Sequence, residues 1–186
     1  MSDASKVRVA VTGAVMAGPY ATTAPTGTGG TTTGHLDLGY VTEDGVTITK
    51  PGAGDSTPIK AWQNGATVRT IRSTTDDLPT IEFVLMETSI NVVKAALGVS
   101  VTSGATEGHY DINTDVQAAA GSWIVDVIDG AELIRSHAPK ATPVGEVAMV
   151  YKNDEPIGYS VTLECEKDST AGYNIRTWAT ALKTPV

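Results

Sequence analysis

The chain has one cysteine, one phenylalanine and only 13 lysine or arginine residues among its 186 positions. A single sulfur, that of Cys165, can build neither an intramolecular disulfide nor a zinc quartet or redox pair, so cytoplasmic folding is the simplest inference. The 21 acidic residues bring the net charge to −8. Stable nucleic-acid binding is therefore disfavoured, because proteins that hold phosphates gather basic residues on one surface.

Long apolar runs and the usual catalytic motifs are also missing. Neither a membrane span nor a secretion signal is expected, because the longest uncharged stretches consist of Gly, Thr, Pro and Ala. No G-x-S-x-G elbow exposes a nucleophile. The glycine-rich residues 27–30 lack the following Lys-Ser/Thr of a phosphate loop. The sequence thus predicts a protein that is not an enzyme and takes no cofactor.

The three histidines offer little support for a metal centre. They are far apart in the chain, and none has a second His or Cys two to four residues away. Each also adjoins a turn or loop stretch. We therefore interpret His35, His109 and His137 as surface residues and expect no metal site.

The chain is rich in residues that favour strands, with 27 threonines and 20 valines. Period-two alternation of apolar residues recurs along most of its length. These patterns predict a mainly β fold, a sandwich or barrel of about 8 to 10 strands, in a single domain over residues 1–186. The segments that carry the patterns are 7–11, 36–40, 46–48, 59–73, 80–87, 123–127, 132–135, 144–152, 157–166 and 173–180.

One helix is expected, over residues 89–97. Thr88 or Ser89 can cap its beginning, and Gly98 stands where a left-handed residue would end it. Ile90, Val93 and Leu97 form a stripe of about three turns, enough to cover one face of a sheet. The helix should flank the β structure.

Two segments are predicted to be loops. Residues 18–34 contain Pro, Thr, Ala and Gly with only Tyr20 to bury, which favours an exposed loop. In residues 42–58, a turn sequence at 43–45 is followed by KPGAGDSTP, whose prolines and glycines cannot continue a sheet. Long loops inside small domains usually carry a function. Short flexible arms are expected at 1–5 and 181–186.

Acidic residues dominate one part of the chain. Between Lys94 and Arg135 there are six of them and no lysine or arginine. Charge alone favours a solvated face. A second interpretation is a surface that repels another polyanion, past which DNA could slide without binding. The six acidic residues are Glu107, Asp111, Asp115, Asp126, Asp129 and Glu132.

Three ordered segments carry a family likeness: LGYVTEDGVTI at Leu38–Ile48, IKAWQNGATVRTIRS at Ile59–Ser73 and TIEFVLMETSINVVKAALG at Thr80–Gly98. Together they resemble the major tail protein of bacteriophages with long, non-contractile tails, most closely that of phages of actinobacteria. The later YSVTLECE is similar to the closing strand of that family, whereas residues 99–145 match no signature.

The resemblance implies a tail-tube fold similar to that of type VI secretion tube proteins. Copies would close into hexameric rings that stack into a hollow tail tube, assembled in the host cytoplasm, through which double-stranded DNA passes without stable binding. Tape-measure, tail-terminator and baseplate or distal tail proteins would be its other partners, with no membrane involved. The loop at 42–58 would then reach a neighbouring subunit or the next ring, with Glu43, Asp44, Lys50, Asp55 and Lys60 as contact candidates. The six acidic residues named above would become candidates for an acidic lumen or surface.

Two other functions remain open from the residues. A capsid decoration protein or a tail-associated immunoglobulin-like binding domain would share the strand count and the Thr and Val content, without requiring rings. A small hydrolase would need a nucleophile and a base that no motif brings together.

Overall fold

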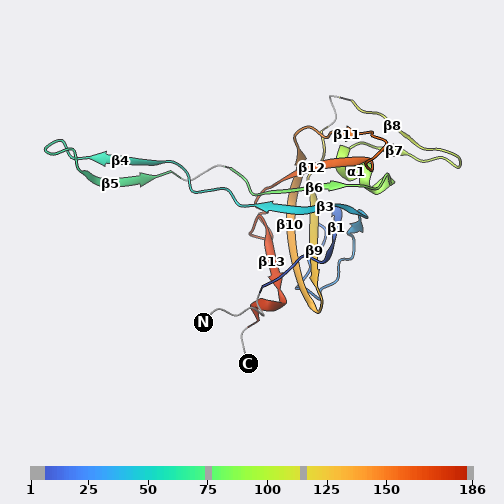
Figure 1. Ribbon diagram of the computed structural model, residues 1–186, viewed down its shortest axis with the longest axis horizontal. Helices are drawn as coiled ribbons and strands as arrows, with labels where there is room; N and C mark the ends of the chain where they lie inside the picture. Colours follow the sequence, from blue (N-terminus) through green and yellow to red (C-terminus); the bar gives the residue numbers. More distant parts are fainter. Residues whose placement is uncertain (1–6, 74–76, 114–116, 184–186) are drawn as a thin grey trace.

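The computed structural model describes residues 7–73, 77–113 and 117–183 and confirms the mainly β fold with one flanking α-helix. Nine strands form one antiparallel sheet, with a central order of β2-β1-β9-β10-β12-β6-β3, while β13 pairs with β10 and β11 pairs with β12 (Figure 1). Their bounds are β1 Thr12–Pro19, β2 Leu36–Asp37, β3 Val41–Thr49, β6 Thr80–Leu85, β9 Gly121–Asp129, β10 Glu132–Val144, β11 Met149–Val150, β12 Gly158–Cys165 and β13 Arg176–Ala179.

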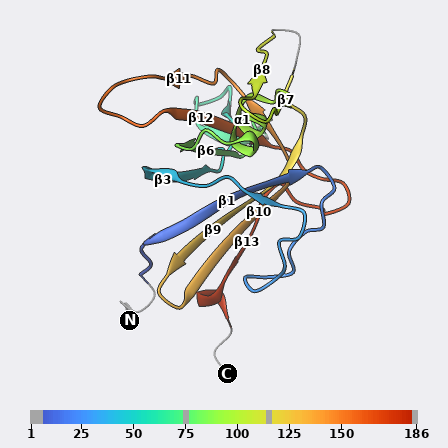
Figure 2. The same cartoon turned by 90° about the vertical axis from the view of Figure 1, so that its right-hand side faces the viewer.

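The sheet folds over on itself because β10 belongs to two layers. Its first half pairs with β9 and β13, and its last residues, Ala141–Val144, pair with β12. The register with β9 shifts between Ala138 and Ala141, at Pro139, which cannot donate to a strand ladder and is tolerated at such a bulge. Figure 2 shows the result, with β1, β9, β10 and β13 crossing beneath β3, β6 and β12.

The core lies between these layers and under the helix α1, Ile90–Leu97. Phe83 of β6, 4% exposed, packs against Trp123 of β9 with ring centroids 6.0 Å apart. Ser89 caps α1 by accepting a hydrogen bond from the Val92 amide, and Gly98 ends it at φ +68°, as expected. The buried residues of the helix are Val92, Val93 and Ala96. The prediction that Ile90 faces the sheet is therefore wrong, since Ile90 is 46% exposed.

The predicted loop over 42–58 is wrong for its first half. Residues 42–49 belong to β3, which pairs with β6. The turn sequence at 43–45 forms a bulge instead, because six residues of β3, Val41 to Val46, lie opposite only three of β6, Phe83 to Leu85, with Gly45 at φ +71°. The bulge lets the strand resume its pairing at Val46. A strand of two halves interrupted by turn residues is difficult to distinguish from a hairpin in the sequence.

The alternating valines of 7–11 do not form a core strand. Val7, Val9 and Val11 are 62–70% exposed, and β1 begins only at Thr12. At the other end, Thr180–Leu182 form a short 3-10 turn, η2, where a flexible arm was expected. The rest of the expected arms, 1–5 and 184–186, lies outside the described residues.

Two small hairpins stand apart from the main sheet. One pairs β4, Ser56–Lys60, with β5, Thr67–Arg72, and the other pairs β7, Val101–Thr102, with β8, His109–Tyr110. They project from opposite ends of the body, the β4–β5 hairpin much farther (Figure 1). No helix within the described ranges is long and apolar enough to cross a membrane.

Candidate functional site

The β4–β5 hairpin, which we call the arm, is the most prominent projection of the molecule. Its strands pair from Ser56 opposite Arg72 to Lys60 opposite Thr67. The turn between them is closed by backbone bonds from the Ala61 amide to the Ala66 carbonyl, 2.7 Å, and from the Gly65 amide to the Ala61 carbonyl, 2.8 Å. The Asn64 side chain accepts from the Ala66 amide, and Gly65 takes a left-handed φ of +68°. The tip is therefore an ordered turn.

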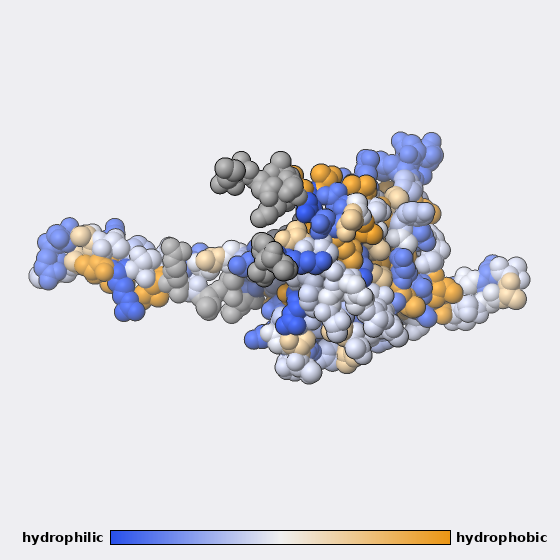
Figure 3. All heavy atoms as spheres, turned by 90° about the horizontal axis from the view of Figure 1, so that it is seen from below, coloured by the Kyte–Doolittle hydropathy of each residue, from blue (hydrophilic) through white to orange (hydrophobic). Residues whose placement is uncertain are grey.

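The arm exposes apolar side chains that an isolated protein would normally bury. Trp62, in the turn, is 94% exposed, and Ile59, Val68 and Ile71 are 40–66% exposed. Figure 3 shows apolar patches along this projection between hydrophilic residues. A two-stranded hairpin is only marginally stable in water without a packing partner, and exposed apolar patches mark interaction sites. The arm therefore has the properties of a contact element.

The candidate contact residues from the sequence lie in three different places. Glu43 and Asp44 are exposed in the β3 bulge on the body, not on the arm. Lys50 and Asp55 lie in the connection that leads from β3 to the arm, where the Asp55 carbonyl accepts from the Ser73 amide and hydroxyl. Lys60 alone lies on the arm itself, at the end of β4 next to the turn. The sequence pattern placed the loop too early in the chain and did not identify Trp62 as a contact residue.

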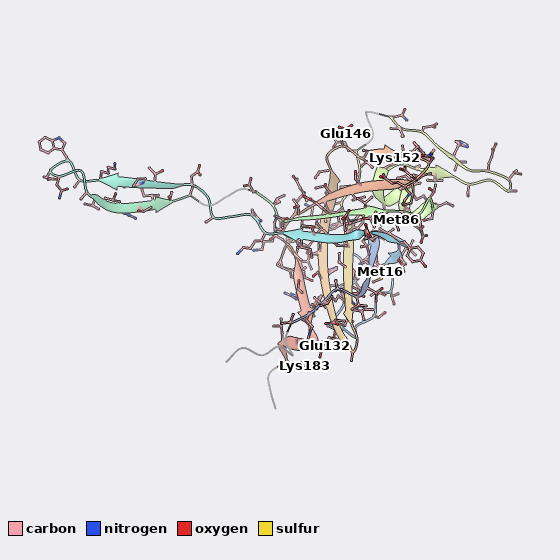
Figure 4. All side chains as sticks on the ribbon, in the orientation of Figure 1. Met16, Met86, Glu132, Glu146, Lys152 and Lys183 are labelled. Carbon is pink, nitrogen blue, oxygen red and sulfur yellow. The ribbon has the colours of Figure 1, made fainter. Side chains whose placement is uncertain are left out.

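The structure divides the acidic candidates between two ends of the body. Glu107 and Asp111 are exposed at the β7–β8 hairpin. Asp129 and Glu132 lie at the β9–β10 turn, and Figure 4 shows Glu132 near Lys183 at the lower end of the body. Asp129 accepts from the Val9 amide, 3.1 Å, and Glu132 pairs with Arg8, 3.7 Å. The candidates thus form no continuous acidic face, and Asp115 lies outside the described residues.

Asp126 is not a surface acid at all. It is 8% exposed and forms a two-bonded ion pair with Arg135, at 2.7 and 2.6 Å, across the β9–β10 pair. The carboxylate holds the pKa of the Arg135 guanidinium above its usual value. Arg135 also donates to the carbonyls of Gly30, 2.6 Å, and Gly27, 3.4 Å. The buried pair thereby anchors the glycine-rich loop of 18–34 to the sheet.

Two of the three histidines are buried, contrary to the expectation from the sequence. The Ser122 hydroxyl lies 2.9 Å from Nε2 of His35 and 2.9 Å from Nε2 of His137, and Nδ1 of His137 lies 2.9 Å from the Tyr173 hydroxyl. His137 is fully buried on β10, and His35 is 8% exposed. Burial lowers the pKa of both imidazoles. The pKa of His137 falls to about 4, because repulsion from His35 and Arg176 adds to the effect of burial. We call these four residues the histidine network.

Burial separates Ser122 and both imidazoles of this network from solvent. The histidine network is buried, and its hydrogen bonds pair Nε2 of both imidazoles and Nδ1 of His137, while Nδ1 of His35 has no partner among the described residues. Burial raises the pKa of the Cys165 thiol to about 12, which keeps it protonated and unreactive. Among the residues that the structure describes, no three His, Cys, Asp or Glu side chains meet as a metal ion would require.

Comparison with known proteins identifies the family. The family model described as phage tail tube protein matches residues 1–181, nearly the whole chain. No curated protein sequence matches. The match supports the likeness seen in the sequence, but not its assignment to phages of actinobacteria. Proteins of this family are structural and not enzymes. A β-rich body with a projecting arm agrees with that role, and the chain belongs to the phage tail tube protein family.

Proposed function

We propose that the chain is the repeating subunit of the tube of a long, non-contractile phage tail. Copies close into hexameric rings, and the rings stack into a hollow tube through which double-stranded DNA passes to the host. The proposal rests on the family and on one observation above all, the arm with its exposed Trp62. A side chain as large and apolar as Trp is rarely left in water on a protein that works alone.

The open edges of the main sheet support self-association of this kind. The strand order ends at β2 on one side and at β3 on the other, so each outer strand has one unpaired row of amides and carbonyls. β3 has nine residues, long for an exposed edge. Pairing these edges between neighbouring subunits would satisfy the backbone groups and join the sheets into one inner barrel, as the likeness to tail tubes implies.

The charge of the subunit suits passage of DNA. A net charge of −8 gives the tube an overall negative potential, which repels phosphates. The described candidates for a surface that faces the DNA, or the water around it, are Glu107, Asp111, Asp129 and Glu132. The tube would sit in the virion tail after assembly in the host cytoplasm. Its length and ends would be set by tape-measure, tail-terminator and baseplate or distal tail proteins.

Electron microscopy of the purified protein at high concentration tests the proposal, beside light scattering of the same sample when dilute. We expect tubes or stacked rings with a central hole. Particles that remain monomeric at every concentration, also after addition of a baseplate that initiates polymerisation, would refute it.

A variant without the arm sharpens the test. Ser56–Arg72 would be replaced by a short Gly-Ser linker, which leaves β3 and β6 intact; a deletion from residue 45 to 57 would instead remove the part of β3 that pairs with β6. The variant should keep the melting temperature of the parent and form no long tubes. Normal tubes from it would show that the arm has no role in assembly.

A further inference from the structure

An apolar pocket lies beside α1. It has a volume of about 400 Å³ and is lined by α1, the ends of β1 and β2, and residues 118–121. Most of its lining side chains are apolar, among them Leu36, Ala95, Val99 and Ala119. Pockets of roughly 300 to 1,000 Å³ hold small ligands and single anchoring side chains. We call it the α1 pocket.

A buried hydrogen-bond donor that has no partner among the described residues lies beside the α1 pocket. Trp123 lines it and is 3% exposed, yet its indole Nε1 has no acceptor. Gly121 borders the same atom, since a Cβ at this position would lie 3.1 Å from the Trp123 Nε1. A buried donor left unpaired destabilises the fold. The pocket thus offers an apolar surface, and the unpaired indole N–H is buried behind it.

The arm tip has that chemistry. Trp62 supplies a large apolar ring, and its neighbours Gln63 and Asn64 carry amide groups beside the backbone carbonyls of the turn. Lys94, exposed on α1 at the pocket, adds an ammonium group that can lie over an indole face. Trp is also the residue most often found as an anchor that fills a pocket on a partner.

Charge is complementary between the two ends of the molecule. Residues 50–73, which contain the arm, have four basic residues and one acidic residue, in a chain whose net charge is −8. The β7–β8 hairpin, which contacts α1, carries Glu107 and is followed by Asp111, with no lysine or arginine from 99 to 113. Opposite charges around an apolar anchor steer association and fix its orientation.

An arm that fills this pocket has to come from another copy of the chain. The arm extends away from the body on the side opposite to α1 and the β7–β8 hairpin, so its tip cannot reach the pocket of its own chain (Figure 1). A contact between two different surfaces of the same protein is head-to-tail, and such contacts continue into rings or filaments.

We propose that Trp62 at the arm tip docks into the α1 pocket of a second copy, with the basic arm lying against the acidic β7–β8 hairpin of that copy. This contact rests on the proposed self-assembly and names the surfaces that carry it. Each subunit donates one arm and receives one, so the contact propagates along the assembly.

Disulfide trapping tests the contact directly. Gln63→Cys places a thiol beside Trp62, and Asn91→Cys places one on the exposed side of α1 at the pocket. Both positions are exposed, so neither change threatens the fold. The native Cys165 is buried and stays unreactive. The two single variants are mixed, allowed to assemble and oxidised mildly. Ala131→Cys, exposed in the β9–β10 turn, replaces Asn91→Cys in the matched control.

We expect the Gln63–Asn91 pair to give disulfide dimers at least tenfold more efficiently than the Gln63–Ala131 pair. Adding Trp62→Ala to the Gln63→Cys variant should remove this excess, whereas Trp62→Phe should retain part of it. Tubes in the microscope with equal yields from both pairs would overturn the docking contact and leave the proposed function standing. Absence of any assembly, together with absence of the disulfide, would overturn both.

Discussion

Lowering the pH should destabilise this protein through its histidine network before most carboxylates are protonated. In the folded state the pKa of His137 falls from 6.5 to about 4, because the buried imidazole loses hydration and faces His35 and Arg176. The unfolded chain, with ordinary histidines, therefore takes up a proton at a higher pH than the folded chain does. The stability contributed by neutral His137 is complete above about pH 6.5 and is lost as the pH falls toward 4.

The size of the loss follows from these two values. Integrating the proton linkage for a shift from 6.5 to about 4 gives roughly 2 kcal/mol at pH 5 and roughly 3 kcal/mol at pH 4. The pKa of His35 is also lowered, by its own burial, so the total loss exceeds that of His137 alone. Domains are usually stable by only about 5 to 15 kcal/mol. The loss should be visible in any unfolding curve.

Urea unfolding at pH 7, 6 and 5, followed by circular dichroism, measures the effect. The His137→Gln variant is the control, because it keeps a polar side chain that cannot titrate. Its stability should be lower than that of the parent at pH 7 but should change less between pH 7 and 5. Carboxylates titrate equally in both proteins, so the difference between the two slopes isolates the imidazole. Equal slopes, or an NMR titration in which no buried imidazole has a pKa well below 6.5, would refute the reasoning.

Three further outcomes follow from the contacts. Phe83→Ala should lower the free energy of unfolding by about 3 to 5 kcal/mol because it leaves a cavity against Trp123, whereas Val68→Ala on the exposed arm should not; an unchanged urea midpoint would mean that β6 is not central. Asp126→Ala should lower the free energy of unfolding by about 3 to 5 kcal/mol, because Arg135 is left charged and buried. A loss below about 1 kcal/mol would contradict the burial of the pair. Iodide should quench the fluorescence of Trp62 strongly in the free subunit, and assembly should protect this side chain from quenching. The Trp62→Phe variant assigns the signal. Equal quenching in both states would place Trp62 outside every interface.

The sequence carried enough information for the class of fold. Alternating apolar residues with a high share of Thr and Val predict strands wherever one face must be buried, and β6, β9 and β12 are found where the pattern is densest. The helix was predictable for a local reason, since Ser89 and Gly98 act on their own backbone through capping and a positive φ. The family likeness also came from ordered segments of sequence, and the match over residues 1–181 supports it.

Burial of polar residues could not be predicted, because it depends on partners distant in the chain. His137 is buried beside Ser122, His35 and Tyr173, which lie 15 to 102 positions away, and Asp126 is neutralised by Arg135 only because β9 and β10 pair in one register. The period-two pattern at 7–11 likewise indicates a strand, but no neighbouring layer covers those valines. Local patterns report which residues could share a face, and not what covers that face.

The sequence by itself thus determined the β architecture, the capped helix, the absence of catalytic motifs and the membership of a structural family, because each depends on local chemistry or on ordered segments. Only the tertiary structure decided that residues 42–49 complete a sheet edge, that the arm begins at Ser56, and that Trp62 stands in solvent at its tip. The physical reason is that an apolar residue in a sequence looks the same whether its own fold buries it or leaves it exposed for a partner.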